Sequence, residues 1–450
     1  MTATGYPILR SLDPYHARIG YLGALASVAT RGLDRTDALT VRFCDVLYER
    51  IGRNDDRYAV LMERIPTSRR DEFGQRLVRP EADDPSGAPL SQMAEAPPAD
   101  WPLVAPPKRS QPRLVRTDWH YVSEFWLYDR VMPASLGHLP RDKANRTIEL
   151  ARWTNVILPT LELSETGYLI QHLLQIAQKS TGQPAFNLLN PTAHPCLPML
   201  YFHVILEHEM LLPFLLLELA EWDGRQPTTR GSDGVLIRTV RRMLDAIGDT
   251  KDPENALAVR SIDEFHKSIA RKDSTQENYL RPRLENLVDL GLMHRLDDRQ
   301  KFMWSITDAT VRAAKLLSPL AARHNRTTQF LDERLFGVWA NIFDEDKQRV
   351  GALVDRLRWF ALAFKAIGRE FGFTPGRTLA LKACVLAWEA GYLLEVKDVF
   401  DAVYEAAKGP WSQYLRFSGG SRFDAEFLIR VDDAMLPALL VNNPLAGSTP

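Results

Sequence analysis

The sequence predicts a mostly α-helical, multi-domain protein with small β-hairpins. First, 450 residues with 45% hydrophobic and 25% charged side chains suffice for roughly two to four globular domains and exclude a disordered, collagen-like or rod-like coiled-coil chain. Second, apolar residues recur at three- and four-residue spacing in most segments, which is typical of amphipathic helices. Third, two short apolar runs separated by a polar turn follow a predicted helix that ends at Gly291.

The charge balance limits how the chain could bind nucleic acid. It carries 56 Lys and Arg against 57 Asp and Glu, a net charge of −1, so any contact with DNA has to come from a local basic patch. Cys44, Cys196 and Cys384 lie far apart without a CxxC motif, so neither a disulfide framework nor a cysteine zinc site is expected. This cysteine usage favours a reducing, cytoplasmic location.

No segment is expected to cross a membrane. The most hydrophobic stretch, Leu211–Ala220, contains Pro213 and Glu218 and is far shorter than the ~20 residues that a spanning helix needs. The apolar stretch Ile19–Ala29 has the composition of a signal-peptide core, but Asp13 before it and a regular helical pattern after it argue against that interpretation. We therefore expect a cytoplasmic protein without membrane contact.

Proline, glycine and charge mark the first domain boundaries. Residues 1–78 are predicted as an N-terminal helical domain, with the helix-start signal Asp13-Pro14 near its beginning. Residues 79–117 are predicted as an extended linker, because nine prolines lie between Pro80 and Pro112 and proline removes backbone donors. The end of this linker, residues 108–116, carries four basic residues and no acid.

Further units follow the linker. Residues 118–224 are predicted as a helical module with a short hairpin, and residues 235–320 as a second module of helices and a hairpin. Residues 327–372 are predicted as a helical connector whose evenly spaced aromatic residues form a core stripe. Residues 373–436 are predicted as a C-terminal α+β module, and residues 437–450 as a frayed tail.

The segment 274–317 is the most informative part of the sequence. Residues 274–277 match a capping box, and leucines 280, 284 and 287 place one apolar stripe on the helix that follows. Gly291 is expected to end this helix. Residues 292–296 and 301–306 are predicted as the strands of a hairpin, and Thr307-Asp308 as the cap of a further helix.

This order of helix, glycine, hairpin and threonine-capped helix resembles the winged-helix superfamily. A second copy is similar, because residues 161–174 align without a gap with residues 304–317, and residues 153–158 supply its outgoing strand. A third, weaker candidate is the segment 374–432, with predicted helices at 376–390 and 398–408 and a strand at 423–431. We expect two winged-helix-like modules, or three if this last segment is counted.

The resemblance implies DNA contact. In winged-helix proteins the helix before the wing commonly enters the major groove, and the wing contacts phosphates. The basic residues predicted to bind DNA are Lys267, Arg271, Lys272, Arg281, Arg283, Arg295, Arg299, Lys301, Arg241 and Arg242.

The outer face of the predicted recognition helix argues against DNA contact. On a helical wheel this face presents Asn278, Pro282, Glu285, Asn286 and Asp289. Phosphates would repel its carboxylates. A solvated face on a structural or protein-binding module stays open as the alternative, because fold alone does not decide function.

A metal site and a nuclease site are weaker hypotheses. His203, Glu207 and His208 share a helix and could ligate a metal, but HExxH is absent, and a buried glutamate satisfied by a histidine explains the pattern better. Glu395-Val-Lys397 resembles the second half of a PD-(D/E)xK nuclease site, in which carboxylates hold Mg²⁺, but the first half is missing.

The prediction for function is a non-enzymatic DNA-binding protein without a cofactor, since no nucleotide-binding or serine-hydrolase motif occurs. Its expected partners are double-stranded DNA and other protein subunits, and self-association stays open. By analogy, such a chain would be a subunit of a larger bacterial-type complex for defence, restriction or mobile-element movement. The alternatives are an adaptor subunit that binds proteins and a metal-dependent nuclease.

Overall fold

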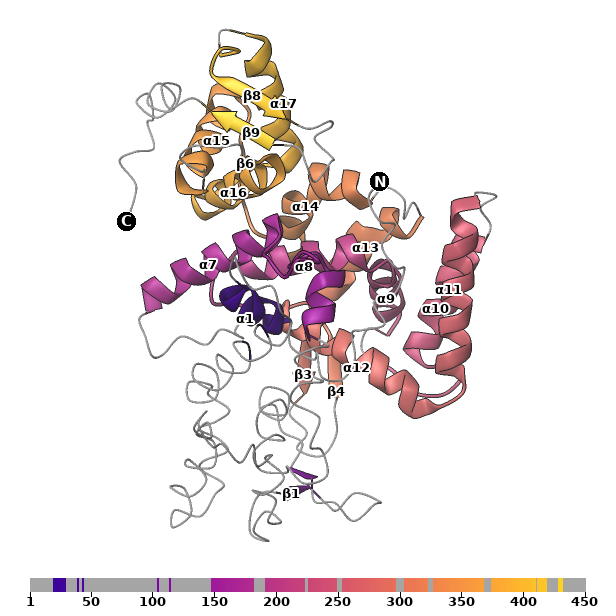
Figure 1. The fold of residues 1–450 in the computed structure, drawn as a ribbon. Coiled ribbons are helices and arrows are strands. Elements are labelled where there is room, and N and C mark those ends of the chain that lie inside the picture. The colour runs from indigo at the N-terminus through magenta and orange to yellow at the C-terminus, as the bar shows by residue number, and fades with distance from the viewer. Residues whose placement is uncertain are drawn as a thin grey trace, which may run out of the picture.

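A computed structural model describes residues 19–29, 39, 43, 103–104, 113–114, 147–181, 191–222, 226–248, 253–296, 303–322, 327–367, 374–409, 411–418 and 428–431. This part is mostly helical with short strands, as predicted (Figure 1). Most of the predicted N-terminal domain, residues 118–146 and the predicted tail lie outside it. Within the predicted linker, β1 (Leu103–Val104) and β2 (Arg113–Leu114) form a short antiparallel ladder.

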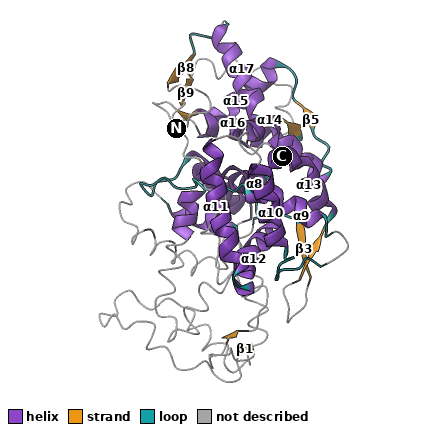
Figure 2. Ribbon diagram, turned by 90° about the vertical axis from the view of Figure 1, so that its right-hand side faces the viewer, coloured by secondary structure: helices purple, strands orange, loops and turns teal. Residues whose placement is uncertain are grey.

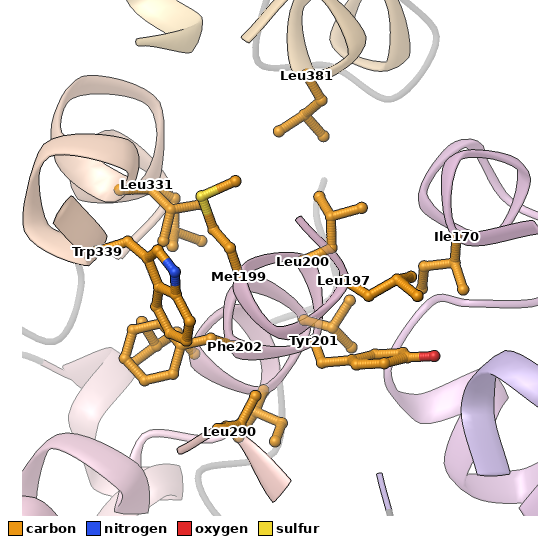
Figure 3. Close-up of a cluster of buried hydrophobic side chains, with 14 of the residues drawn as sticks. Ile170, Leu197, Met199, Leu200, Tyr201, Phe202, Leu290, Leu331, Trp339 and Leu381 are labelled. Carbon is orange, nitrogen blue, oxygen red and sulfur yellow. The ribbon is translucent and has the colours of Figure 1, made fainter. Parts of the chain in front are cut away.

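The centre of the fold is a helix that is apolar on nearly every side. This helix, α8 (Leu197–His208), is buried from Leu197 through Leu206 and packs beside α1 (Gly20–Val28), α7 (Glu165–Thr181) and α14 (Thr327–Phe343). Figure 3 shows its side chains among Ile170 of α7 and Trp339 of α14, and the Phe202 and Trp339 ring centroids lie 5.2 Å apart. Continuous apolar sequence therefore forms the core here.

A second buried helix, α9 (Leu211–Ala220), follows α8 after a sharp break. The two axes differ by 111°. No single helix in the described part is long and apolar enough to span a membrane, and only this bent pair has the length and composition to do so.

The first helix–hairpin unit comprises α10 (Val235–Gly248), α11 (Pro253–Ala270), α12 (Asp273–Asp289), β3 (Met293–Leu296), β4 (Met303–Ile306) and α13 (Asp308–Ala322). The predicted hairpin is confirmed, because β3 and β4 pair antiparallel with Met293 opposite Ile306. α10 and α13 both pack on α9, so the unit is anchored to the central body.

Local sequence signals correctly predicted the end of α12 and the start of α13, but not the start of α12. Gly291 stops α12 with a φ of +75°, a conformation that favours glycine. Thr307 caps α13, since its hydroxyl accepts the Thr310 N–H at 3.2 Å and donates to the Leu292 carbonyl at 2.8 Å. The predicted capping box at 274–277 is wrong: α12 begins at Asp273, and its N-cap Lys272 makes no side-chain cap bond.

The C-terminal unit, residues 353–431, comprises α15 (Leu353–Ile367), β6 (Thr374–Pro375), α16 (Gly376–Glu389), β7 (Tyr392–Leu393), α17 (Val396–Lys408), β8 (Leu415–Ser418) and β9 (Leu428–Val431). The three helices pack on one another, and β6, β9 and β8 form an antiparallel sheet in that order (Figure 1). Figure 2 shows β8 and β9 beside these helices. β5 (Gln348–Arg349) pairs parallel with β7. The predicted aromatic core stripe is confirmed, with Phe336, Trp339 and Phe360 buried.

The proposed second copy is simpler than predicted. Between residues 153 and 164 only an isolated antiparallel bridge joins Ile157 and Leu163, because the chain turns back within a few residues. Ser164 caps α7 as predicted, since its hydroxyl accepts the Gly167 N–H at 3.0 Å. This segment therefore shares the capped helix with the first unit but lacks its ladder.

Candidate nucleic-acid interface

The prediction that Arg283 binds DNA is wrong, because the residue is buried. Arg283 is 3% exposed, and its Nε donates to Glu209 Oε1 at 2.9 Å. Glu209 lies at the break between α8 and α9 and is 2% exposed. The pair therefore ties α12 to the central body, and removing either charge would take the opposite charge away from the other inside the core.

The arginines of α10 neutralise acids at the end of α9. Arg238 Nη2 lies 2.8 Å from Glu221 Oε2, and Arg242 pairs with the other oxygen of the same carboxylate. Arg238 also pairs with Glu218, which is 2% exposed. The hydrogen bond and charge of Arg242 lower the pKa of Glu221. The Arg242 charge therefore faces a carboxylate of the protein. This corrects the prediction that Arg242 contacts a DNA phosphate.

Three other predicted cations lie on the surface around the corner between α11 and α12. Arg271 and Lys272 are exposed at the corner itself. Lys267, one turn before it, pairs with Asp263 at 2.5 Å.

The two remaining predicted cations lie away from this corner. Arg241 is exposed on α10 and donates to the Ser232 carbonyl at 3.3 Å, while Arg281 of α12 is half-buried. Of the cations predicted here, Arg271 and Lys272 form the most accessible pair.

The predicted wing cations fall mostly outside the described residues. Arg295 lies on β3 opposite Trp304, but its side chain is not among those described. Arg299 and Lys301 also lie outside the described part of the chain.

The outer face of α12 is not a solvent face, contrary to the prediction. Pro282, Glu285 and Asn286 are all buried. Glu285 accepts the Trp304 indole N–H at 2.9 Å, and Asp289 accepts the Ile19 backbone N–H at 3.1 Å. The middle of α12 is therefore enclosed by β4 and by the segment before α1, and it cannot enter a DNA groove.

The exposed N-terminal end of α12 faces a loop. Asp273 accepts the Gly231 N–H at 3.1 Å, and Glu277 pairs with Arg230 at 2.6 Å. This end therefore presents acids that are already neutralised by the residues before α10. The exposed cations nearest to this end are Arg271 and Lys272, which precede the helix at the corner.

The residues of the metal hypothesis meet around an arginine. His203 Nδ1 and His208 Nε2 lie 3.6 and 3.8 Å from Glu207 Oε2. The Arg377 guanidinium lies 3.9 Å from Glu207 and 3.0 Å from Asp332. Among the residues that the structure describes, no group of His, Cys, Asp and Glu side chains is arranged to hold a metal ion.

The protonation of this cluster agrees with a polar core network. Burial lowers the pKa of His203 to about 4, so the ring is neutral near pH 7. Burial alone would raise the pKa of Glu207, but Arg377, His203 and His208 together outweigh it and lower the pKa. The Arg377 guanidinium supplies positive charge beside Glu207.

The two residues of the nuclease hypothesis, Glu395 and Lys397, do not converge on one site but serve different partners. Glu395 is 3% exposed at the N-cap of α17, and its carboxylate accepts the N–H groups of Phe336 at 3.1 Å and Gly337 at 2.8 Å. Lys397 pairs with Asp401 on the surface of the same helix. A carboxylate that faces the backbone of α14 cannot hold Mg²⁺ beside Lys397.

Two arginines that sequence reasoning missed lie on the hairpin β8–β9. Arg416 and Arg430 are direct cross-strand partners, and both are exposed. Their neighbours Leu415, Ile429 and Val431 are buried, so the arginines share the outer face. The alternation in Leu-Arg-Phe-Ser marks an outward arginine, but the register that pairs it with Arg430 needs the folded sheet.

The described residues thus form a mostly helical protein in which two helix–hairpin units share one apolar core. Comparisons with protein-family models, curated proteins and solved structures find no match for the chain.

Proposed function

We propose that this chain is a non-enzymatic DNA-binding protein that contacts the duplex backbone through the C-terminal unit. The elements α15, β6, α16, α17, β8 and β9, with β9 between β6 and β8, resemble a winged-helix module, although a short strand, β7, lies between α16 and α17 and pairs with β5 instead. The weakest of the three sequence candidates thus has the most complete arrangement. The topology supports a winged-helix fold for this unit, and the surface charge supports DNA binding as its function.

The cross-strand pair Arg416 and Arg430 is the observation that carries the proposal. Like charges directly opposite on a sheet are unfavourable, so their placement suits a surface that meets an anion. Residues 411–418 and 428–431 contain no acid, and Ser412, Gln413 and Ser418 are exposed hydroxyl or amide donors. Guanidinium groups, hydroxyls and amides are common phosphate ligands.

The contact is expected to position the protein on DNA rather than read its sequence. The half-exposed and exposed residues of α17 include Lys397 and Lys408 together with Asp401 and Glu405, so this helix has no net positive face. Figure 1 shows β8–β9 at the top of the molecule, whereas α12 lies below the central helix α8. The corner at Arg271 and Lys272, just before α12, is therefore a separate, second contact in this proposal.

A fluorescence-anisotropy titration of a labelled duplex against salt tests the proposal. Each phosphate contact contributes about 0.9 to the slope of log affinity against log salt, so Arg416→Gln/Arg430→Gln should lower the slope by about 2. Between ~50 and ~200 mM salt the wild type should therefore lose about tenfold more affinity than this variant.

Arg349→Gln is the matched control. Arg349 is also an exposed arginine near the C-terminal unit, but it pairs with Asp398 at 3.3 Å. Its loss should leave the salt slope nearly unchanged. Equal effects of the control and the double variant would refute a specific role for the hairpin arginines.

A structural or adaptor subunit is the second candidate function. The enclosed middle of α12 favours it, because a helix whose outer face is packed serves the fold rather than a groove. Trp153, Leu158 and Tyr168 are exposed large hydrophobic residues close together in sequence, as expected of a chain that contacts other subunits. No duplex binding by the wild type at low salt would favour this candidate over the first.

A further inference from the structure

A pair of aromatic rings lies next to the hairpin arginines. Trp411 and Tyr414 precede β8, and their ring centroids lie 6.1 Å apart with the ring planes tilted by 51°. The Tyr414 N–H donates to the Trp411 carbonyl at 3.0 Å, so a backbone turn holds the two residues together. Arg416 is the second residue after Tyr414, and two residues of extended chain span at most about 7 Å. The rings and the outward arginine therefore belong to the same small region of the C-terminal unit.

Both rings are only partly covered by the rest of the unit. Trp411 and Tyr414 are half-buried, and both pack against the apolar core. A ring that the core already holds loses little conformational freedom when a ligand covers its exposed part. The pair is therefore a preformed aromatic surface, and a flat ligand can bind to it without ordering new side chains.

The surroundings of the two rings are basic. Arg416 and Arg430 are exposed on β8 and β9, and Lys408 is exposed at the end of α17, three residues before Trp411. Glu405 is the exposed acid of α17 nearest to them in the sequence. Because exposed cations outnumber exposed acids in this part of the unit, the aromatic pair suits an anionic ligand with flat faces.

Aromatic rings beside cations suit a nucleic acid whose bases are unpaired. Inside a duplex the flat faces of each base are covered by the neighbouring bases, so a protein ring cannot stack on them. Unpaired bases expose these faces and stack on aromatic side chains, while basic groups hold the phosphates. A surface that held only the phosphates of an intact duplex would need the arginines but not the rings.

We propose that the C-terminal unit prefers DNA with unpaired bases, so that a single strand leaving a duplex stacks on Trp411 and Tyr414 while Arg416 and Arg430 hold its phosphates. The inference rests on the DNA binding proposed above and names the form of DNA that this surface recognises. Stacking tolerates any base, because every base has a flat aromatic face. The preference is therefore for a structure of DNA rather than for a sequence.

Fluorescence anisotropy with the full-length protein tests this preference. The probes are a duplex with a single-stranded oligothymidine extension, the same duplex with an abasic extension of equal length, and the blunt duplex. The two extensions carry the same phosphates, so the ratio of their affinities isolates the contribution of the bases. The wild type should bind the thymidine extension about tenfold more tightly than the abasic one. Trp411→Ala should bring this ratio close to one, whereas Trp411→Phe should retain most of it, because an aromatic ring remains.

Trp359→Ala is the matched control. Trp359 of α15 is also half-buried in the C-terminal unit, and its ring centroid lies 6.0 Å from that of Tyr392 at a similar tilt of 47°. Tyr392 lies on β7, which pairs with β5 instead of with the sheet that carries the arginines. The control removes a ring of the same size and should keep the wild-type ratio.

The outcomes separate this inference from the proposed function. Equal affinity of the wild type for the two extensions would overturn the inference, while salt-dependent binding of the blunt duplex would still support the function. An equal fall of the ratio in Trp359→Ala would overturn it as well, because it would indicate a general disturbance of the unit. No binding of any probe would overturn both proposals.

A fluorescence measurement decides if Trp411→Ala does not fold. The chain has ten tryptophans, so the emission of Trp411 is taken as the difference between the wild type and Trp411→Phe. Oligothymidine should quench this difference emission, because a stacked base lies against the indole ring. Unchanged difference emission at saturating oligothymidine would contradict the stacking.

Discussion

The first helix–hairpin unit and the C-terminal unit have similar elements but use their arginines in opposite ways. In the first unit Arg283 and Arg242 face carboxylates of the central body. In the C-terminal unit Arg416 and Arg430 face each other on an exposed sheet surface. The same residue type therefore serves cohesion at Arg283 and Arg242 and, in our proposal, recognition at Arg416 and Arg430. A count of basic residues cannot separate these uses.

The strongest test of this comparison is Arg283→Ala. The change removes the arginine charge that faces the buried Glu209 carboxylate, so the free energy of unfolding should fall by about 3–5 kcal/mol. Urea denaturation measures the change. Arg260→Ala, which removes an exposed arginine paired with Glu264 on α11, should cost less than about 1 kcal/mol. Equal losses would show that Arg283 is not a core residue.

A smaller effect is expected from Trp304→Phe in the same unit. The change keeps an aromatic ring but removes the N–H that Glu285 accepts, so it should destabilise the protein by about 1–3 kcal/mol. The loss should be smaller in a background that carries Glu285→Leu, because the Trp304 N–H then has no carboxylate to donate to before the change. A double-mutant cycle by urea denaturation checks this coupling. Additive losses would contradict a direct hydrogen bond.

The smallest effect has the opposite sign and lies in the C-terminal unit. Arg430→Gln removes a like-charge cross-strand pair, so the stability without DNA should rise by about 0.2–1 kcal/mol. The gain should shrink at high salt, which screens exposed charges. Thermal denaturation at two salt concentrations measures it. A decrease in stability would show that an acidic side chain already neutralises these arginines.

Local sequence signals predicted much of the first unit. Gly291, Thr307 and the two short apolar runs placed the end of α12, the cap of α13 and the β3–β4 hairpin correctly. These features depend on residues within a few positions of one another. The helical wheel of α12 failed, because it assumed that the face opposite the leucine stripe meets water, whereas β4 and the chain before α1 cover it.

The candidate site was less predictable than the fold. Arg283 finds its acid 74 residues away, and Glu395 finds its N–H donors 58 and 59 residues away. No local pattern marks such partners. Sequence reasoning therefore named a buried arginine as a DNA contact and a helix cap as a nuclease carboxylate.

The sequence by itself determined the helical class, the β3–β4 hairpin and several helix ends, because propensity, periodicity and capping act over a few neighbouring residues. Only the tertiary structure decided which charges are buried, which are neutralised and which face outward. The physical reason is that the free energy of a charge depends on its partners and its solvent, and folding brings both from distant parts of the chain.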